Sequence, residues 1–389
     1  MTTHGFSTTL IHRGERKPAP APLTTPIYET TTFVFDSADA VRRYNEGGSG
    51  LYLYSRYENP TVVAAEEKLA AVEGADRALA FGSGMAASST LLLALLTSGD
   101  EVVCSAASYG GTFHLLEDFL PKFGIAHRFV SLDDLRTPEA VIGERTRIVW
   151  FESPSNPHLR CVDIAGIAAA CRARNVLSVI DNTFASAINQ RPLEMGVDLV
   201  MQSATKYLNG HNDLLAGVVS GRQELVHEVE MARRKLGGIL DPQPAYALGR
   251  ALKTLPMRVA RHNANGMAVA AALEGHPSVS RVYYPGLPSH PDHAIATRQM
   301  SGFGGMVCID LKGGEAAACR AFDRLHVISR AASLGGIESL CSLPILTSHW
   351  GYSDEALAKA GVTKGMMRLS LGLEDPEDLI ADLRQALDS

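Results

Sequence analysis

The sequence lacks the features that would place a chain in a membrane or on a nucleic acid. No stretch approaches the roughly 18 consecutive apolar residues of a membrane span. No long block of lysine and arginine interrupts a chain whose net charge is only −6, so the basic surface typical of nucleic-acid binding is missing. We therefore predict small-molecule partners, and neither a membrane nor a nucleic acid among them.

Targeting and metal-binding patterns are also scarce. The first residues lack the continuous apolar segment of a signal peptide, which favours a cytoplasmic location. His290 and His293 lie in a proline-rich loop without a third ligand nearby, and zinc usually requires three or four protein ligands, so no metal site is predicted. The six cysteines include no C-x-x-C pair, and we expect reduced thiols at Cys104, Cys161, Cys171, Cys308, Cys319 and Cys341.

The length of 389 residues, with 46% hydrophobic residues, allows two or three domains and a sizeable core. Residues 1–58 include a proline-rich stretch that predicts an extended N-terminal arm. Within 59–250, apolar runs such as EVVCS and VLSVIDN alternate with helical patterns. This alternation predicts an α/β fold with a mostly parallel central sheet covered on both faces. Residues 251–389 mix the two patterns and predict a smaller α+β C-terminal domain.

Polar residues stand where several predicted strands end. Glu152 follows RIVWF, Asp181 follows VLSVI, and Ser203, Thr205 and Lys206 follow VDLVMQ. Ligands of open α/β sheets bind beyond such carboxyl ends. Taken singly, a strand-end aspartate is more often a turn or cap residue than a catalyst, and a lone lysine is more often solvated than reactive.

Together these residues match the needs of one cofactor. A partly desolvated lysine binds its proton less tightly and can form a Schiff base with a carbonyl group. A neighbouring aspartate can keep a pyridine nitrogen protonated. The hydroxyl groups of Ser203 and Thr205, with the amides of Gly84 and Met85 at a helix start, can hold a phosphate. This combination of amine, carboxylate and phosphate cradle predicts pyridoxal 5′-phosphate (PLP).

A dinucleotide-binding interpretation of the same glycine-rich turn is weaker. Gly82, Gly84 and Ala87 match G-x-G-x-x-A, and Asp100 lies 16 positions beyond Gly84. The turn follows a long predicted helix instead of opening a βαβ unit. This interpretation also leaves Lys206 without a role.

Eight short blocks resemble the PLP-dependent enzymes of cysteine and methionine metabolism, the trans-sulfuration enzymes. Residues 203–213 fit the pattern S-x-T-K-Y-x-x-G-H-[SN]-D. The other blocks are YSRYENPT (54–61), SGMAA (83–87), SYGGT (108–112), ESPSNP (152–157), DNTFAS (181–186), SLGGIESL (333–340) and MRLSLGLED (367–375). The resemblance covers nearly the whole chain. It implies a fold-type I PLP-dependent transferase, with the aspartate-aminotransferase-like fold.

The resemblance also implies a role for individual residues. Lys206 would form the Schiff base with PLP and later move protons, Asp181 would pair with the pyridine nitrogen, and Tyr109 would stack on the ring. Lys206, Tyr109 and Tyr54 are the implied catalytic residues. The implied phosphate-binding residues are Gly84, Met85, Ser203 and Thr205, joined by Tyr54 and Arg56 of a neighbouring subunit.

The amino-acid substrate would bind on the other side of the cofactor. By resemblance, Arg368 binds the substrate carboxylate through its planar guanidinium, with Ser333 beside it. Asn156 would lie near both the ring hydroxyl and the substrate. Because Tyr54 and Arg56 act across an interface, the implied assembly is a homodimer at least, commonly a tetramer built from two dimers with shared active sites.

Within the family, several stretches resemble the plant-type cystathionine γ-synthases. They include NPHLRCVDI (156–164), GHNDLLAG (210–217) and RVYYPGLPSHPDH (281–293). We therefore predict γ-replacement on an activated homoserine, O-acylated or O-phosphorylated, by cysteine to give cystathionine. The alternative is a γ-elimination, as in methionine γ-lyase or cystathionine γ-lyase, which gives 2-oxobutyrate and ammonia.

Three positions bear on that choice. Ala332 stands where many bacterial cystathionine γ-synthases and γ-lyases carry glutamate. Gly111 stands where methionine γ-lyases usually carry cysteine. Residues 344–354 are expected to border the substrate entrance. A binding module without catalysis is a further alternative, but the presence of Lys206 and Asp181 argues against it.

Overall fold

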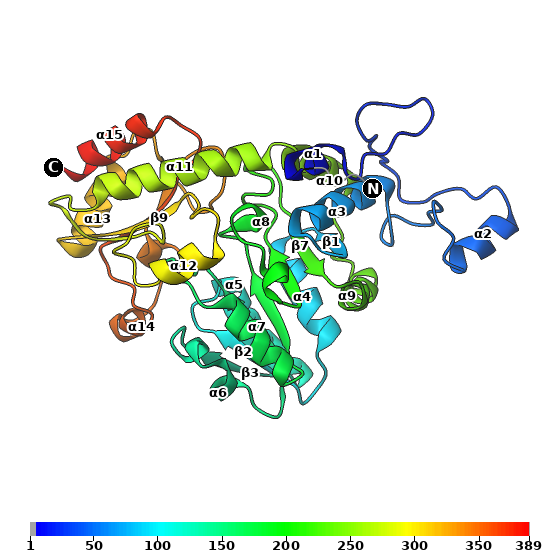
Figure 1. Ribbon diagram of the computed structural model, residues 1–389, viewed down its shortest axis with the longest axis horizontal. Helices are drawn as coiled ribbons and strands as arrows, with labels where there is room; N and C mark the ends of the chain where they lie inside the picture. The colour runs from blue at the N-terminus through cyan, green and yellow to red at the C-terminus, as the bar shows by residue number, and fades with distance from the viewer. Residues whose placement is uncertain (1–4, 389) are drawn as a thin grey trace.

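The computed structural model describes residues 5–388, which fold around two β-sheets (Figure 1). The strands of the larger sheet are β1 (Arg77–Phe81), β2 (Glu101–Ser105), β3 (Ala126–Val130), β4 (Thr146–Glu152), β5 (Leu177–Asp181), β6 (Leu199–Gln202) and β7 (Gly217–Gly221). Their spatial order is β1-β7-β6-β5-β4-β2-β3. Only β7 is antiparallel to its neighbours, and the other pairings are parallel. The prediction of a mostly parallel sheet is confirmed.

Helices cover both faces of this sheet, as predicted. The helices of residues 5–252 are α1 (Phe6–His12), α2 (Ala38–Asn45), α3 (Pro60–Glu73), α4 (Gly84–Leu95), α5 (Gly110–His114), α6 (Pro138–Val141), α7 (Ile164–Ala173), α8 (Ser186–Asn189), α9 (Gln223–Leu236) and α10 (Pro242–Leu252). Of these, α2 lies on the N-terminal arm and not on the sheet (Figure 1). Adjacent strand residues point to opposite faces. Val102 packs with Leu91 of α4, whereas Val103 packs with Ile167 of α7.

Local sequence signals set the ends of the helices near the site. The Asn59 side chain accepts a hydrogen bond from the Thr61 amide, Pro60 occupies the first turn, and Gly74 ends α3 with a φ of 69°. In the same way, the Ser83 hydroxyl accepts from the Ala86 amide and begins α4. The glycine-rich turn therefore leads directly into a helix N-terminus.

The smaller sheet lies at the other end of the molecule (Figure 1). Its strands are β8 (Val279–Tyr283), β9 (Met306–Leu311), β10 (Ser329–Arg330), β11 (Leu340–Ser342) and β12 (Met366–Ser370), in the spatial order β10-β11-β12-β9-β8. Only β10 and β11 are parallel neighbours. The helices of this region are α11 (Leu255–Leu273), α12 (His293–Gln299), α13 (Gly314–Asp323), α14 (Asp354–Lys359) and α15 (Pro376–Leu387).

Helix α11 connects the two regions. Leu255 and Val259 in its first half pack in the core beside α3 and α10, whereas Val269 and Leu273 in its second half pack on the smaller sheet. Figure 1 shows α11 running along the molecule between these cores. A division into 1–58, 59–250 and 251–389 stays a prediction, because α11 belongs to both cores.

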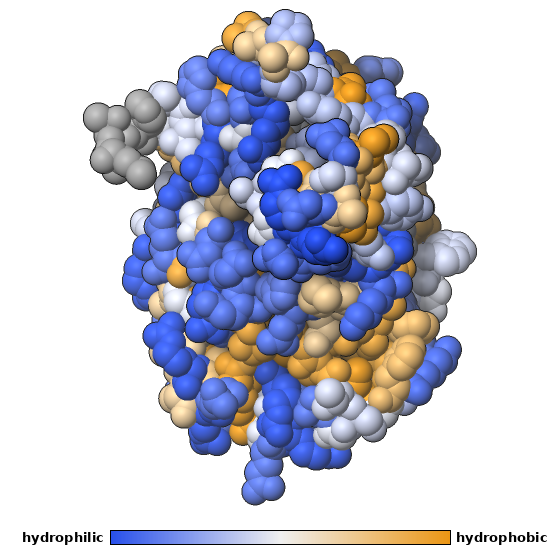
Figure 2. Space-filling model, turned by 90° about the vertical axis from the view of Figure 1, so that its right-hand side faces the viewer, coloured by the Kyte–Doolittle hydropathy of each residue, from blue (hydrophilic) through white to orange (hydrophobic). Residues whose placement is uncertain are grey.

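The N-terminal arm extends away from the large sheet and carries α2 at its tip (Figure 1). Large apolar side chains are exposed on it: Leu23 is 84% and Val34 95% exposed. The face that carries the arm also shows apolar surface between hydrophilic areas (Figure 2). In residues 5–388 no helix is long and apolar enough to cross a membrane.

Candidate active site

The carboxyl ends of β4, β5 and β6 bring the predicted strand-end residues together. Glu152 ends β4 and lies opposite Asp181, the last residue of β5. The chain leaves β6 at Gln202, and the Ser203 amide donates a hydrogen bond to the Thr183 hydroxyl at 2.8 Å. Ser203 and Lys206 therefore begin beside the end of β5, as the parallel order requires.

Lys206 reaches from this edge toward the smaller sheet. Its Nζ donates a hydrogen bond to Ser333 Oγ at 2.7 Å. Burial, and the nearby positive charge of Arg368, lower the pKa of the Lys206 amine. A lysine in this setting reaches its neutral, nucleophilic form more readily than a solvated lysine does.

Ser333 and Arg368 form the part of the site that belongs to the smaller sheet. Ser333 has a φ of 101°, an unusual conformation for a residue other than glycine. Its carbonyl oxygen accepts from Arg368 Nη2 at 3.3 Å, and Arg368 Nη1 donates to Asn156 Oδ1 at 3.0 Å. Lys206, Ser333, Arg368 and Asn156 are thus joined by consecutive contacts.

Two buried carboxyl groups, Asp181 and Glu152, lie side by side where β4 and β5 end. The amide and hydroxyl of Thr183 donate to Asp181 Oδ1 at 3.0 and 2.5 Å, but burial still raises the pKa of Asp181. Burial and the neighbouring Asp181 raise the pKa of Glu152 well above its ordinary value. Within residues 5–388 neither carboxyl group has an ion-pair partner, so this region suits a bound cation such as a protonated pyridine nitrogen.

A phosphate site is available where α4 begins. The Ser83 hydroxyl accepts a hydrogen bond from the Ala86 amide, and the Ser83 carbonyl accepts one from the Ala87 amide. The amides of Gly84 and Met85 can therefore donate to a ligand. A Cβ atom at Gly84 would lie 3.2 Å from Ser203 Oγ, which shows how closely this hydroxyl approaches the helix start. This arrangement fits the phosphate of PLP.

Thr205 lies beside this group, but its hydroxyl is engaged by the backbone. The hydroxyl donates to the Ala216 carbonyl at 3.2 Å and accepts from the Ala216 amide at 3.0 Å. An ionised phosphate accepts hydrogen bonds, so a contact with it would need the single hydroxyl proton that is donated to the Ala216 carbonyl. The predicted role of Thr205 therefore requires this hydroxyl to turn away from the Ala216 carbonyl.

Tyr109 stands at the edge of the same site. Its amide donates to a carboxylate oxygen of Glu152, and its side chain is 55% exposed. A Cβ atom at Gly111 would lie 2.6 Å from Tyr109 Cε1 and 2.8 Å from Met85 Sδ. Tyr109, Met85 and Gly111 therefore pack together, and a side chain at position 111 would displace the Tyr109 ring and the Met85 sulfur.

Tyr54 and Arg56 are not brought to Lys206 within the described chain. The Arg56 guanidinium donates to the Arg234 carbonyl and lies 4.7 Å from the centre of the Tyr57 ring. Tyr54 is 40% exposed on the N-terminal arm. This location agrees with the expectation that both residues act in a neighbouring subunit.

Arg258 and Gly335 contact the backbone directly after Lys206, and neither was among the predicted site residues. Arg258 on α11 is buried and donates to the carbonyls of Tyr207 and Leu208, at 2.7 and 3.2 Å, directly after Lys206. A Cβ atom at Gly335 would lie 2.6 Å from the Tyr207 amide nitrogen. A buried arginine on an amphipathic helix gives no distinct sequence signal, but the paired glycines of SLGGIESL do indicate a close backbone approach.

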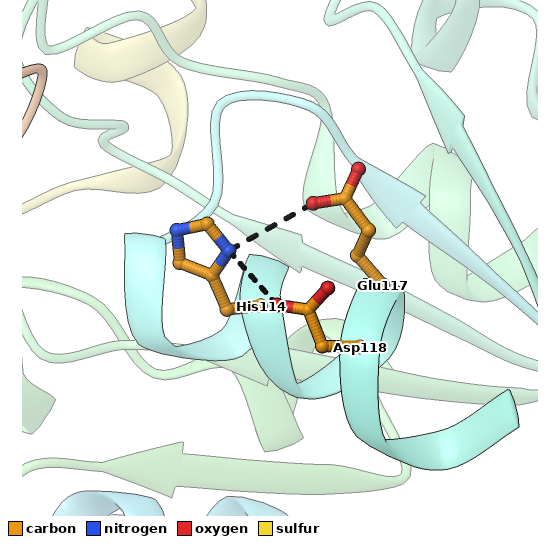
Figure 3. A group of neighbouring side chains, drawn as sticks. All are labelled: His114, Glu117 and Asp118. Carbon is orange, nitrogen blue, oxygen red and sulfur yellow. Dashed lines mark ion pairs between the residues drawn. The ribbon is translucent and has the colours of Figure 1, made fainter. Parts of the chain in front are cut away.

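A separate polar group lies on the surface where α5 ends. His114 Nδ1 is 3.7 Å from Glu117 Oε2 and 3.5 Å from Asp118 Oδ2 (Figure 3). All three side chains are exposed. Acidic groups beside a histidine are common on protein surfaces, and we assign this cluster no role in the site.

Comparisons with known proteins agree with this geometry. The model of the Cys/Met metabolism PLP-dependent enzyme family matches residues 7–388. An L-methionine gamma-lyase of Fusobacterium nucleatum is 42% identical over 392 residues, which cover 100% of this chain and 99% of that protein. Cystathionine gamma-synthase 1, chloroplastic, of Arabidopsis thaliana is 42% identical over 383 residues, which cover 97% of this chain and 68% of that protein.

A solved structure extends the match to three dimensions. The crystal structure of metB from Corynebacterium glutamicum has a TM-score of 0.92 with 39% identity, and the match covers 99% of this chain and 98% of that one. The predicted fold class and cofactor are confirmed. The chain therefore belongs to the Cys/Met metabolism PLP-dependent enzymes, and it is a trans-sulfuration enzyme with small-molecule amino-acid substrates.

Proposed function

We propose that this enzyme catalyses γ-replacement: it joins an O-acylated or O-phosphorylated homoserine to cysteine and forms cystathionine. The observation that carries this choice is the packing around Gly111, where a Cβ atom would lie 2.6 Å from Tyr109 Cε1. The site is thus built around a glycine at the position where methionine γ-lyases usually carry cysteine. The plant-type blocks at 156–164, 210–217 and 281–293 support the same choice.

PLP would be held by groups already close to one another. Lys206 would hold its aldehyde carbon, Asp181 its ring nitrogen, and Ser203 with the α4 amides its phosphate, while Tyr109 and Asn156 would border the ring. When bound, the cofactor supplies an electron sink that makes the α- and β-hydrogens of an amino acid acidic. The carboxyl groups of Asp181 and Glu152, which have no ion-pair partner within residues 5–388, support this orientation of the ring.

The protein groups would divide the remaining tasks. Arg368 presents a planar guanidinium suited to an α-carboxylate, and Ser333 beside it helps to fix the substrate. Lys206 Nζ, whose pKa is lowered, is the group that would take the α-proton and return it at a later position. Tyr109 is half exposed at the edge of the site, where its hydroxyl can contact the departing γ-group.

The second candidate is γ-elimination. L-methionine gamma-lyases from Fusobacterium nucleatum and Pseudomonas deceptionensis are each 42% identical, the same identity as the Arabidopsis synthase. Ala332, next to Ser333, is exposed and carries no carboxylate. A site without that carboxylate has less means to bind the distal amino group of cystathionine.

Product analysis tests the proposal. PLP-loaded enzyme is given O-acetyl-, O-succinyl- or O-phosphohomoserine with and without cysteine, and separately methionine or cystathionine. We expect cystathionine from one activated homoserine plus cysteine, and little 2-oxobutyrate from methionine. The matched control is Lys206→Ala. Abundant 2-oxobutyrate from methionine or cystathionine, with no cystathionine made, would establish the γ-lyase instead.

We also propose a homotetramer assembled from two dimers that share their active sites. The exposed Tyr54 and the distance of Arg56 from the Lys206 region support this arrangement. Light scattering of the purified protein measures the assembly size. Mixing Lys206→Ala subunits with Arg56→Ala subunits after mild unfolding should restore part of the activity, because a mixed dimer contains one intact site. Full activity of Arg56→Ala alone would contradict the shared site.

A further inference from the structure

The turn at residues 289–293, SHPDH, has no role in the site described above, yet it buries a carboxylate. The Asp292 side chain is fully buried. Its Oδ2 accepts hydrogen bonds from Arg160 Nε at 2.5 Å and from the Cys161 amide at 3.0 Å. Its Oδ1 accepts from Arg136 Nη2 at 3.1 Å. A carboxylate removed from water requires such partners, and all of these belong to the region of the larger sheet.

His290 strengthens the same contact. Its Nδ1 accepts from the Asp292 amide at 3.2 Å, so in the neutral imidazole Nε2 carries the proton. That nitrogen lies 3.2 Å from the His158 carbonyl oxygen, to which it donates. Burial lowers the pKa of His290 and favours this neutral form. The turn therefore holds residues 158–161 at both ends.

The segment held in this way closely follows a residue of the substrate site. Asn156, two residues before His158, accepts from Arg368 Nη1 at 3.0 Å. Among the described residues, the other hydrogen-bond partner of the Arg368 guanidinium is the Ser333 carbonyl. The orientation of Arg368 therefore depends on where the segment 156–161 lies.

We propose that Asp292 is a positioning residue for substrate recognition. It fixes residues 156–161 through Arg160, Arg136 and the Cys161 amide, so that Asn156 holds Arg368 in the orientation that binds the α-carboxylate. Such second-layer contacts set the geometry of the groups that touch a ligand. The inference rests on the role proposed above for Arg368.

The test compares amino-acid binding in Asp292→Asn with that in the unmodified PLP-loaded enzyme. Isothermal titration calorimetry with L-norleucine, which has no γ leaving group, measures binding without turnover. We expect the dissociation constant to rise about tenfold, the effect of a weakened charge-assisted hydrogen bond. KM for the activated homoserine should rise similarly, with little change in kcat. The variant should retain bound PLP, because Asp292 touches none of the groups that would hold the aldehyde carbon, the ring nitrogen or the phosphate.

Two further variants keep the test decisive. Arg136→Gln removes the ion pairs with Asp292 and with the exposed Asp133 at a side chain that is 53% exposed, so folding should be preserved. We expect the dissociation constant of L-norleucine to rise about threefold. Asp163→Asn is the matched control: Asp163 pairs with Arg298 at 3.0 Å and also links the two regions, but at the surface. Asparagine still suits the N-cap of α7. This control should bind L-norleucine as the unmodified enzyme does.

The outcomes separate this inference from the role of Arg368. Arg368→Lys should weaken L-norleucine binding; if it does not, the proposed role of Arg368 is wrong. If Arg368→Lys weakens binding while Asp292→Asn and Arg136→Gln bind normally, the positioning role of Asp292 is wrong. Loss of bound PLP in Asp292→Asn, with unchanged binding in Arg136→Gln, would also overturn it, because Asp292 would then act on folding alone.

Discussion

The two sides of the active site are built differently. On the side of the larger sheet, Asp181 and Glu152 end adjacent strands, and Lys206 follows shortly after the next strand, so the sheet register fixes them. On the side of the smaller sheet, Ser333 lies outside any strand in an unusual backbone conformation. The segment 344–354 beyond it contains mainly turns. We call the larger-sheet part, with Asp181, Glu152 and Lys206, the rigid side. The smaller-sheet part is the irregular side, where Ser333 lies outside any strand although Arg368 lies in β12. We expect the rigid side to hold the cofactor and the irregular side to bind the amino acid.

The largest loss of activity is expected for a substitution on the rigid side. Lys206→Ala removes the amine that would hold PLP and move protons, and we expect kcat to fall by at least about 10³-fold. The absorbance of the bound cofactor should change as well. Stopped-flow absorbance with substrate measures both effects. A variant that keeps more than a tenth of the activity would show that another group takes the proton.

The second largest loss of activity is expected for a substitution on the irregular side. Arg368→Lys replaces a planar fork by a point charge, and we expect kcat/KM to fall about 100-fold, mainly through KM. The absorbance of bound PLP should be unchanged, in contrast with Lys206→Ala. Steady-state kinetics with the activated homoserine separates the two parameters. A loss confined to kcat would contradict the proposal that the irregular side binds the amino acid.

Alkaline pH should weaken the rigid side. Glu73, the last residue of α3, accepts from Gln202 Nε2 at the end of β6, and burial raises its pKa from 4.5 to about 8. The folded state thus keeps a proton that the unfolded state loses above pH 4.5. The contribution of Glu73 to stability is therefore greatest below that pH, falls as pH rises to about 8, and then levels off.

Glu73→Gln should abolish this dependence. Between pH 5 and pH 9 the unmodified protein should lose on the order of 4 kcal/mol of unfolding free energy relative to the variant. Urea unfolding at both pH values measures the difference. Parallel pH dependence of the two proteins would mean that Glu73 is ionised in the folded state.

A smaller loss of activity is expected for a substitution at the boundary between the two sides. Gly111→Ala places a methyl group where Tyr109 Cε1 and Met85 Sδ lie within 3 Å, so the Tyr109 ring must move. We expect kcat to fall about tenfold with PLP retained. Gly110→Ala is the matched control, because nothing lies within 4 Å of a Cβ atom there. Equal kinetics for both variants would show that the ring position is unimportant.

Much of the rigid side could be predicted from the sequence. Lys206, Asp181 and Ser203 follow apolar runs, and the parallel order brings strand ends together without further information. The first turn of α4 was also predictable, because Ser83 and the glycines signal a helix start. Glu152 was recognised as a strand-end residue, but its contact with the Tyr109 amide joins positions 43 apart and leaves no local pattern.

The irregular side was less accessible to the same reasoning. Arg368 lies in a strand that resembles any other, and only the resemblance to the family indicated its task. In the larger sheet and the N-terminal part of the chain, too, some elements were not predicted: the strands β1 and β3 and the helices α1 and α2. β3, for instance, is an edge strand with the polar residues His127 and Arg128, so tertiary pairing and not hydrophobic alternation defines it.

The ratio of products formed from one activated homoserine tests the central claim most directly. With saturating cysteine, cystathionine and 2-oxobutyrate are quantified in the same reaction by mass spectrometry. The account predicts that cystathionine exceeds 2-oxobutyrate at least tenfold and that the ratio falls as cysteine is withdrawn. A ratio below one that does not respond to cysteine would contradict γ-replacement and identify the enzyme as a γ-lyase.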